Sequence, residues 1–349
     1  MAGRRGPRSI RQAAAAPWPG SPGRNPARPG AGAALVAQDL AEPIQGGPAG
    51  LAGALGRGLA RAADLWVLTK PRIVLMLVVS GVLAAWVAAG GRPDPARLVG
   101  FILTGGLAAA GAAAFNHFTD RDLDGRMART AGRPLPAGRL EPLQALELAV
   151  VLSLAGVSAA AVLLGGPVAL VLLAGILVYA GLYSLWLKRR TAWNIVLGGS
   201  AGSLMVLAGW LSQTGRTGPL AWLLFAWLFL WTPTHFWPLA VAVRDDYARA
   251  GVPMLPVTAG TRRAAWITLA NTVALVLLSL VPALWGIYGP VHTLLVAVAG
   301  AGLTGLNLAM ALAPGGRRER LAWRLYKLSG PYLGWILTIL AVATAAGRG

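Results

Sequence analysis

Long runs of apolar residues, separated by short polar segments, fill the chain from residue 73 to its C-terminal end. A helix needs about 20 apolar residues to cross the roughly 30 Å of a bilayer core, and helices pair all of their backbone groups internally. The pattern therefore predicts an all-α integral membrane protein with nine membrane-spanning helices in one bundle. The predicted spans are Ile73–Ala89, Leu98–Phe115, Leu143–Leu164, Pro167–Leu187, Trp193–Ser212, Pro219–Val243, Ala265–Tyr288, Val291–Leu312 and Leu325–Ala346.

The first 62 residues lack this apolar pattern and are rich in Arg, Ala, Pro and Gly. Such a composition predicts a disordered basic tail, followed by a membrane domain over residues 63–349. A mitochondrial targeting peptide is the alternative for the tail, because residues 1–38 contain six Arg and no acidic residue. We expect the membrane to be a bacterial plasma membrane, with the mitochondrial inner membrane as the alternative.

Basic residues are distributed unevenly between the two ends of the predicted spans. With the N-terminus in the cytoplasm, 27 of the 31 Lys and Arg residues fall on the cytoplasmic side. The positive-inside rule gives such a bias when the number and parity of the spans are right. We therefore predict a cytoplasmic N-terminus, an external C-terminus, and two long cytoplasmic loops, 116–142 and 244–264.

The composition also excludes several classes of function. Charged residues make up 12% of the chain, about half of the usual fraction, so a soluble globular domain is excluded. There is no cysteine, which excludes a disulfide scaffold and a thiolate nucleophile. The net charge of +19 lies in short clusters between apolar runs, and the 14 tryptophans suit membrane interfaces. The expected partner is a lipid bilayer and not nucleic acid.

The first long loop begins with a regular acidic pattern. Asn116, Asp120 and Asp124 recur every four residues and share one face if the preceding helix continues. Two carboxylates at this spacing repel each other unless a cation binds between them. Their oxygens suit Mg²⁺, which typically takes one or two carboxylates together with phosphate oxygens. The competing interpretation is a solvated loop whose aspartates pair with nearby arginines.

Basic side chains stand on the same predicted side of the membrane, and the second long loop adds another pair of acids. The bases are Lys70, Arg72, Arg133, Lys188 and Arg189, and the acids are Asp245 and Asp246. Acids that hold a metal ion and bases that hold anionic oxygens together indicate a diphosphate site. Its ligand would be an amphiphile whose apolar tail lies between helices.

Six strings of residues resemble, in their order, the UbiA superfamily of intramembrane prenyltransferases, and most closely its haem-modifying branch. They are TKPR at 69–72, NHFTDRDLDGRMART at 116–130, RPLPAGR at 133–139, YSLWLKRRT at 183–191, THFW at 234–237 and DDYARAGVPMLP at 245–256. The resemblance implies a bundle around a central cavity. It also implies transfer of a farnesyl group from farnesyl diphosphate to haem B, with Mg²⁺ as cofactor.

The resemblance assigns roles to the residues above. Asp120, Asp124 and Lys188 would be catalytic, and the metal ligands would be Asp120, Asp124, Asp245 and Asp246. The diphosphate contacts would be Asn116, Arg133, Lys188, Arg189, Lys70 and Arg72. The second acidic motif departs from the D-x-x-x-D spacing of the superfamily, since Arg249 follows Asp245 by four residues. The ligands of a second metal ion are therefore left open.

The candidates for the acceptor pocket are His235, Trp237 and Tyr247. A histidine can ligate haem iron, and a hydrogen-bonded buried histidine is the competing interpretation for both His235 and His117. Trp231 and Phe236 line the same stretch, where aromatic side chains also serve as interface anchors.

Two other functions compete with this interpretation. One is a prenyltransferase for an aromatic quinone precursor or a chlorophyll-like ring, with the same metal site and a different acceptor pocket. The other is an ion- or proton-coupled transporter, in which the aspartates relay charge. A relay needs ionisable groups at mid-membrane depth, whereas Glu147 is the one acid within the predicted spans and lies near an end.

Overall fold

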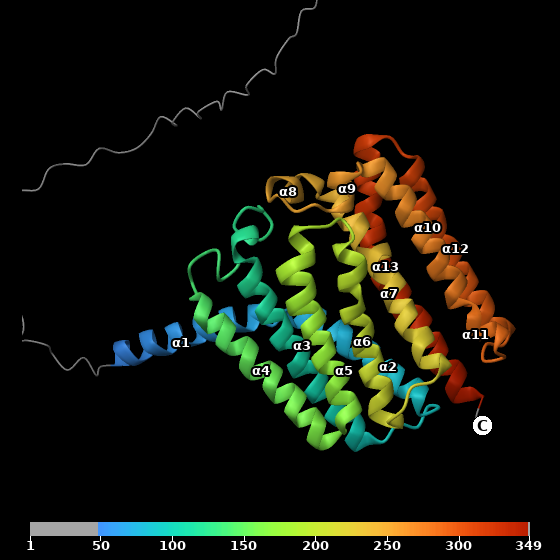
Figure 1. The fold of residues 1–349 in the computed structure, drawn as a ribbon, viewed down its shortest axis with the longest axis horizontal. Helices are drawn as coiled ribbons and strands as arrows, with labels where there is room; N and C mark the ends of the chain where they lie inside the picture. The colour runs from blue at the N-terminus through green and yellow to red at the C-terminus, as the bar shows by residue number, and fades with distance from the viewer. Residues whose placement is uncertain (1–47, 348–349) are drawn as a thin grey trace, which may run out of the picture. The chain divides into compact units, whose positions relative to one another are not determined.

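The computed structural model describes the backbone of residues 48–347 and the side chains of residues 55–347. The chain divides into two units, Met1–Gly53 and Ala54–Gly349, and the helical bundle belongs to the second (Figure 1). All of its regular elements are helices: α1 Pro48–Leu68, α2 Pro71–Ala88, α3 Pro95–Asp124, α4 Pro142–Leu163, α5 Gly166–Ile176, η1 Leu177–Trp186, η2 Leu187–Arg189, α6 Asn194–Thr214, α7 Pro219–Ala242, α8 Arg244–Arg249, α9 Leu255–Thr258, α10 Thr261–Ser279, α11 Val281–Leu284, α12 Pro290–Leu312 and α13 Gly315–Ala346.

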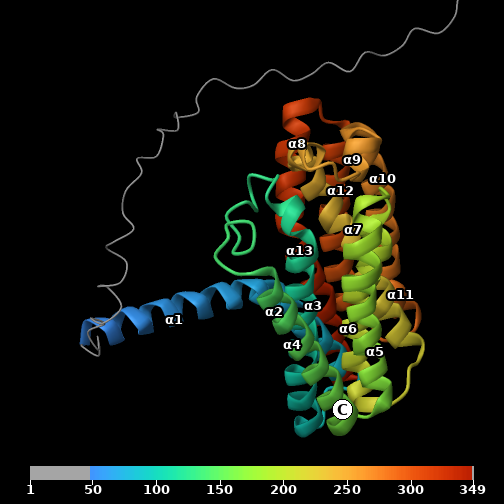
Figure 2. The ribbon, with the colours of Figure 1, turned by 60° about the vertical axis from the view of Figure 1, so that its left-hand side comes forward.

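The helices of the bundle cross it alternately up and down, so the connections gather at two ends. Figures 1 and 2 both show the C-terminal end of α3 at the same end of the bundle as α8 and α9. Helices α6 and α7 pack against each other, with α2 on α6 and with α10 and α13 on α7. This arrangement brings the two loops that carry acidic motifs to one end of the molecule.

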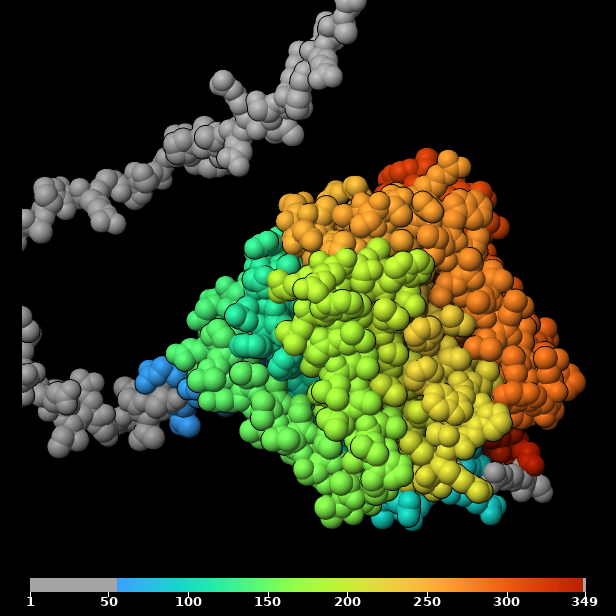
Figure 3. Space-filling view, in the orientation of Figure 1, coloured from blue at the N-terminus to red at the C-terminus, as the bar shows by residue number. Residues whose placement is uncertain are grey.

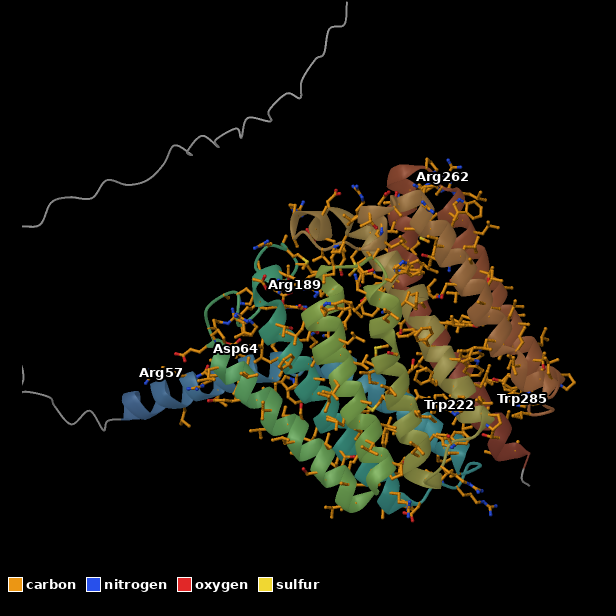
Figure 4. The ribbon with its side chains drawn as sticks, viewed as in Figure 1. Arg57, Asp64, Arg189, Trp222, Arg262 and Trp285 are labelled. Atoms are coloured by element: carbon orange, nitrogen blue, oxygen red, sulfur yellow. The ribbon has the colours of Figure 1, made fainter. Side chains whose placement is uncertain are left out.

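The surface of the bundle is apolar, as expected for helices in lipid. Large apolar side chains face outward on many helices: Val162 is 84% exposed and Leu284 is 85% exposed. Figure 3 shows α4, α5 and α7 as adjoining bands on one face. Two tryptophans, Trp222 and Trp285, lie toward the end away from the acidic loops, where Figure 4 labels them. Both are about half exposed, at 52% and 47%, as in the aromatic belt of a membrane interface.

Eight of the described helices are long and apolar enough to cross a membrane. The remaining long helix of the bundle, α7, has 24 residues and no charged side chain, but its Trp, Thr, Pro and His residues reduce its apolar character. An integral membrane protein built from helices is confirmed, whereas nine spans and a cytoplasmic N-terminus stay predictions.

The structure differs from the predicted disordered tail over residues 48–62. These residues belong to α1, whose many Ala, Leu and Arg residues favour helix. The glycines and the preceding prolines of this segment concealed the pattern. The rest of the predicted tail, residues 1–47, lies outside the described residues.

Close helix crossings depend on glycine. At the crossing of α2 and α6, a Cβ atom added to Gly209 would lie 2.0 Å from the carbonyl oxygen of Gly81. At the crossing of α3 and α4, a Cβ atom added to Gly156 would lie 2.6 Å from the backbone nitrogen of Ala108. Small residues therefore let these backbones touch, as is common between membrane helices.

Candidate active site

The acidic pattern lies on the last two turns of α3. The helix continues nine residues past the predicted end of this span and ends at Asp124. Asn116, Asp120 and Asp124 consequently line one face, with exposed fractions of 3%, 1% and 2%. The shared face predicted for these three residues is confirmed, and the face is directed into the protein.

Asp120 is the centre of a buried polar network. One of its carboxylate oxygens, Oδ2, accepts hydrogen bonds from Lys188 Nζ at 2.5 Å and from Asn116 Nδ2 at 2.8 Å. Its second oxygen, Oδ1, is buried and has no hydrogen-bond partner. Buried carboxylate oxygens are normally satisfied, so an unpaired oxygen in a network otherwise well bonded indicates a place for a ligand.

Asp124 is held by the loop that follows α3. Arg133 Nη1 donates to Asp124 Oδ2 at 2.6 Å. The hydroxyl of Thr130 donates to the backbone oxygen of Asp124 at 2.9 Å and so caps the end of the helix. The loop over residues 125–141 thereby fixes one cation beside the second carboxylate.

Lys70 reaches the same network from the junction of α1 and α2. Its ammonium donates to Asn116 Oδ1 and to Tyr179 Oη, the latter at 3.3 Å. Lys70 is the one non-glycine residue with a positive φ among residues 48–347, at 49°. Strained backbone of this kind clusters at functional sites. Burial of the ammonium, with the nearby charges of Arg133 and Lys188, lowers the pKa of Lys70 to about 7.

A stretch of π-helix positions the remaining polar groups. In η1 the turns are wider than in an α-helix. Ser184 on η1 and Lys188 on the following η2 contact the α3 face, and Tyr179 on η1 contacts Lys70. Ser184 Oγ accepts from Asn116 Nδ2 at 2.8 Å and donates to the Tyr179 backbone oxygen at 2.8 Å. Tyr179 and Ser184 cannot be recognised from sequence spacing, because they align with Lys188 only on a helix of longer period than an α-helix.

Arg189 lies beside this network and pairs with Asp122. Its guanidinium donates to both carboxylate oxygens of Asp122, at 2.8 and 2.6 Å, and to the backbone oxygen of Thr119. Asp122 is therefore off the acidic face, as its position in the sequence predicts. Arg72 is exposed and has no side-chain hydrogen bond among the described residues.

The second acidic motif lies on the short helix α8. Asp245 pairs with Arg244 at 3.2 Å and has 78% of its side chain exposed. Asp246 pairs with Arg249. Neither carboxylate joins Asp120 and Asp124, and no three acidic or histidine side chains in the described part of the chain gather closely enough to bind a metal ion.

Tyr247 follows Asp246 on α8 and belongs to the main apolar core of the bundle. Its side chain is buried, with an exposed fraction of 6%. The pKa of Tyr247 is raised, mainly because its side chain is buried. The charge of Asp120 acts in the same direction, and the charges of Arg129 and Arg133 act against it. Helix α8 lies at the same end of the bundle as the C-terminal end of α3.

Comparison with known proteins agrees with this geometry. The model of the family described as "UbiA prenyltransferase family" matches residues 77–330. The chain belongs to this family. It is thus an intramembrane prenyltransferase, and its acidic α3 face lies within the matched range.

Two curated relatives of this UbiA family member are named protoheme IX farnesyltransferase. The protein from Gloeobacter violaceus is 40% identical over 279 residues, which cover 80% of this chain and 91% of the relative. The protein from Paramagnetospirillum magneticum, with the same name followed by the number 1, is 43% identical over 275 residues, covering 79% and 95%.

Two solved structures share this fold at low sequence identity. A digeranylgeranylglyceryl phosphate synthase has a TM-score of 0.69 at 15% identity, with 82% of this chain and 99% of that chain covered. A UbiA homologue from Archaeoglobus fulgidus, bound to DMAPP and Mg²⁺, has a TM-score of 0.58 at 20% identity, covering 79% and 99%.

The charges of the site fit a prenyl diphosphate together with a metal ion. Two buried carboxylates face three cations, Lys70, Arg133 and Lys188, so the network has a surplus of positive charge. The unpaired Oδ1 of Asp120 offers a hard oxygen ligand. Mg²⁺ is commonly bound by one or two carboxylates plus substrate phosphate oxygens, and the residues present fit this pattern.

An aromatic cluster of α7 and α13 surrounds His235. The imidazole stacks on Trp231 with a centroid distance of 4.6 Å and lies 4.5 Å from the Tyr326 ring. Phe236 approaches the imidazole edge-on at 5.4 Å. Nδ1 of His235 is 2.8 Å from the hydroxyl of Ser329.

The other histidine and tryptophan candidates make no hydrogen bond to the residues of this aromatic cluster. Trp237 is buried, meets Trp193 edge-on at 6.4 Å, and has an indole nitrogen without a partner. His117 is buried on α3 beside Asn116, and its Nδ1 has no partner. His292 lies in the first turn of α12, stacked on Tyr288.

Proposed function

We propose that this chain transfers the farnesyl group of farnesyl diphosphate to a vinyl group of haem B, giving haem O and diphosphate. The binding of a diphosphate is supported by the buried carboxylates of Asp120 and Asp124, which more basic side chains than acidic ones surround. The choice of haem B as acceptor is supported by the relatives, whose name specifies protoheme IX and a farnesyl group.

The diphosphate would be held by cations from three elements. Lys70, Lys188 and Arg133 converge on the acidic face of α3, and the amide of Asn116 joins Lys70 to Asp120. Arg72, which is exposed, and Arg189, which now pairs with Asp122, would contact the outer phosphate once the substrate is bound. Charge-assisted bonds to phosphate oxygens are the strong ones.

Asp120 and Asp124 would hold the metal ion, with Oδ1 of Asp120 as the free ligand. Bound Mg²⁺ supplies Lewis-acid stabilisation of the oxygens that leave. Asp245 and Asp246 are proposed as ligands of a second ion. Each now pairs with an arginine of α8, so binding there requires these pairs to open.

The reaction follows from the charges. The bond between the allylic carbon and the phosphate oxygen breaks, and the electron pair leaves with diphosphate, beside Lys70, Lys188 and Arg133. The π electrons of a haem vinyl group form the new carbon–carbon bond to the allylic cation. Water adds to the resulting cation beside the porphyrin and loses a proton, which leaves a hydroxyethylfarnesyl group. Burial of Asp120 and Asp124 keeps bulk water from the allylic cation until it is captured.

His235 is the proposed iron ligand. The Ser329 hydroxyl donates its only hydrogen to the backbone oxygen of Tyr326 at 2.9 Å. We propose the tautomer in which this hydroxyl accepts from Nδ1–H of His235 at 2.8 Å, so that Nε2 keeps a free lone pair for the iron. Metal-binding histidines typically donate their other N–H in this way. Trp237 and Tyr247 would contact the porphyrin or the isoprenoid chain.

Haem binding tests this assignment. His235→Ala should lower the affinity for haem B at least tenfold and abolish the shift of its Soret band, measured by absorbance titration of the purified protein. Ser329→Ala should weaken binding less, because the imidazole remains. His292→Ala serves as the control. An unchanged spectrum in His235→Ala would exclude this histidine as a ligand.

We place the protein in a bacterial plasma membrane, with the acidic loops facing the cytoplasm. The bias of 27 of 31 basic residues toward one side supports this orientation. A mitochondrial inner membrane would be consistent with the same bias.

The acceptor is tested by the mass of the product. Purified protein with farnesyl diphosphate, Mg²⁺ and haem B should form haem O and release one diphosphate per product. With 4-hydroxybenzoate in place of haem B, no product is expected. Product with 4-hydroxybenzoate alone would support the quinone prenyltransferase instead, and no diphosphate release with either acceptor would refute a transferase.

A further inference from the structure

Helix α1 is exposed on all sides along most of its described length. Every residue from Leu55 to Ala63 is exposed. Leu55, Leu59 and Trp66 have exposed fractions of 63%, 72% and 64%. Large apolar side chains in this number are not left in water by an independent helix, so something outside the chain segment that the structure describes must cover them.

Three of the most exposed large apolar residues of α1, Leu55, Leu59 and Trp66, lie on one face. Leu55, Leu59, Ala62 and Trp66 follow the spacing of one helix face, i, i+4, i+7 and i+11. The charged side chains lie on the other face: Arg57, Arg61 and Asp64. This segregation is strong in α1 and weak in the helices of the bundle, which are apolar all round. It is the pattern of a helix that lies along a lipid surface and does not cross it.

One ion pair joins α1 to the segment just before α4. Arg139 Nε donates to both carboxylate oxygens of Asp64, at 3.1 and 3.0 Å. Arg139 lies three residues before Pro142, where α4 begins. Leu143, in the first turn of α4, is apolar and 59% exposed, as expected where a helix enters lipid. The charged face of α1 is therefore held at the level where the apolar helix α4 begins.

The C-terminal end of α1 is anchored in the bundle. Leu68 is fully buried and Leu65 packs beside it, in a small core with Ala114, Leu140 and Ala145. The next helix, α2, begins at Pro71 and is one of the eight helices that suit a membrane. Figures 2 and 4 show α1 running across the direction of the bundle helices, with Arg57 and Asp64 labelled in Figure 4.

We propose that α1 is an interfacial helix that lies in the lipid–water boundary of the membrane, with Leu55, Leu59 and Trp66 inserted among the lipid acyl chains. The partner is the phospholipid surface itself. Arg57 and Arg61 lie opposite the inserted face, where they attract anionic headgroups. A tryptophan next to the first membrane helix is the usual interface anchor.

Asp64 connects the lipid-facing helix α1 to the active site. The ion pair with Arg139 joins α1 to the loop 125–141, and the same loop carries Arg133, which holds Asp124. The lipid surface thereby helps to hold in place the loop that closes one side of the acidic face.

The experiment measures depth in the membrane with spin labels on single cysteines. The natural chain has no cysteine, so each introduced one is unique. The full-length variants Leu55→Cys and Leu59→Cys test the apolar face, with Arg57→Cys and Ala60→Cys as controls on the polar face. Each is labelled, reconstituted into phosphatidylcholine–phosphatidylglycerol vesicles and studied by power-saturation electron paramagnetic resonance.

We expect labels at positions 55 and 59 to collide several-fold more with oxygen than with a water-soluble nickel chelate, and labels at 57 and 60 to show the reverse. Equal access of the chelate to all four positions would show α1 in water and overturn the proposal. Shielding of positions 55 and 59 from both reagents would show a protein contact, such as a second copy, and would also overturn it. These readouts do not depend on the transferase activity.

Discussion

The buried ion pair of Asp120 and Lys188 is costly for stability. Removing two charges from water costs several kcal/mol per ion, and their attraction often does no more than repay this. The pair lies 2.5 Å apart with both side chains nearly inaccessible. A site that keeps such charges, together with an unpaired carboxylate oxygen, is adapted to a ligand and not to stability.

Lys70 belongs to this site through its bond to Asn116, and a substitution tests its role. Lys70→Gln should raise the KM for farnesyl diphosphate about tenfold or more, because a charge-assisted contact to phosphate is lost. Steady-state diphosphate release measures it. Arg126→Gln, which removes an exposed charge from the nearby loop, should change KM less than threefold. Equal effects of both variants would indicate that only the overall charge matters.

Sequence spacing alone brought Asn116, Asp120 and Asp124 together, because residues four apart on an α-helix share a face. The same reasoning could not find Tyr179 and Ser184. Their place in the network depends on the π-helical turns of η1, and no local signal in an apolar run distinguishes a π-helix from an α-helix. The pairing of Arg189 with Asp122 was also hidden, because it joins residues 67 positions apart.

At the scale of the element, helix positions were predicted well and helix ends poorly. Apolar length locates a span, but α3 and α13 continue far into polar sequence, where lipid no longer sets the limit. Helix α1 was not predicted, because its glycines and the basic segment before it conceal its amphipathic spacing.

The glycines repeated within the apolar runs make close helix contacts at some positions only. Gly198 and Gly199 lie against Tyr183 and Thr232, whereas Gly202 has ordinary room. The tightest contact joins Gly209 to Gly81. Which glycine faces a neighbour depends on the rotation of each helix, and helices that are apolar on every side carry little information about it.

The crossing of α2 and α6 yields a prediction about stability. Gly209→Ala should destabilise the protein by about 1–3 kcal/mol, because its methyl group would overlap the Gly81 backbone and the helices must separate. Gly202→Ala on the same helix is the control, since its Cβ atom would meet Leu77 at 3.5 Å. Thermal unfolding in detergent, followed by circular dichroism, compares the two. A lower midpoint for Gly202→Ala than for Gly209→Ala would contradict the packing described.

At the scale of the whole molecule, the chain gathers its chemistry at one end of an apolar bundle. Figure 4 labels Arg189 and Arg262 at this end, away from Trp222 and Trp285. The acidic face of α3, the loop 125–141 and α8 lie there as well. A substrate with a charged head and a long apolar chain can thus place each part in the environment that suits it.

Orientation in the membrane is predicted from the basic residues and can be measured by labelling. Gly132→Cys, in the exposed loop after α3, should react with an impermeant maleimide only after the cells are permeabilised. Arg216→Cys, in the exposed turn between α6 and α7, should react in intact cells. The opposite pattern would place the acidic loops outside.

Metal dependence is the most direct test of the central claim, that Asp120 and Asp124 hold a metal ion against the diphosphate. Diphosphate release by the purified protein, with farnesyl diphosphate and haem B, is measured after chelation and during stepwise return of Mg²⁺. We predict that chelation abolishes release, that Mg²⁺ restores it fully, and that Asp120→Asn and Asp124→Asn stay at least a hundredfold slower at saturating Mg²⁺. Undiminished release by the chelated protein, or by either variant, would contradict the claim.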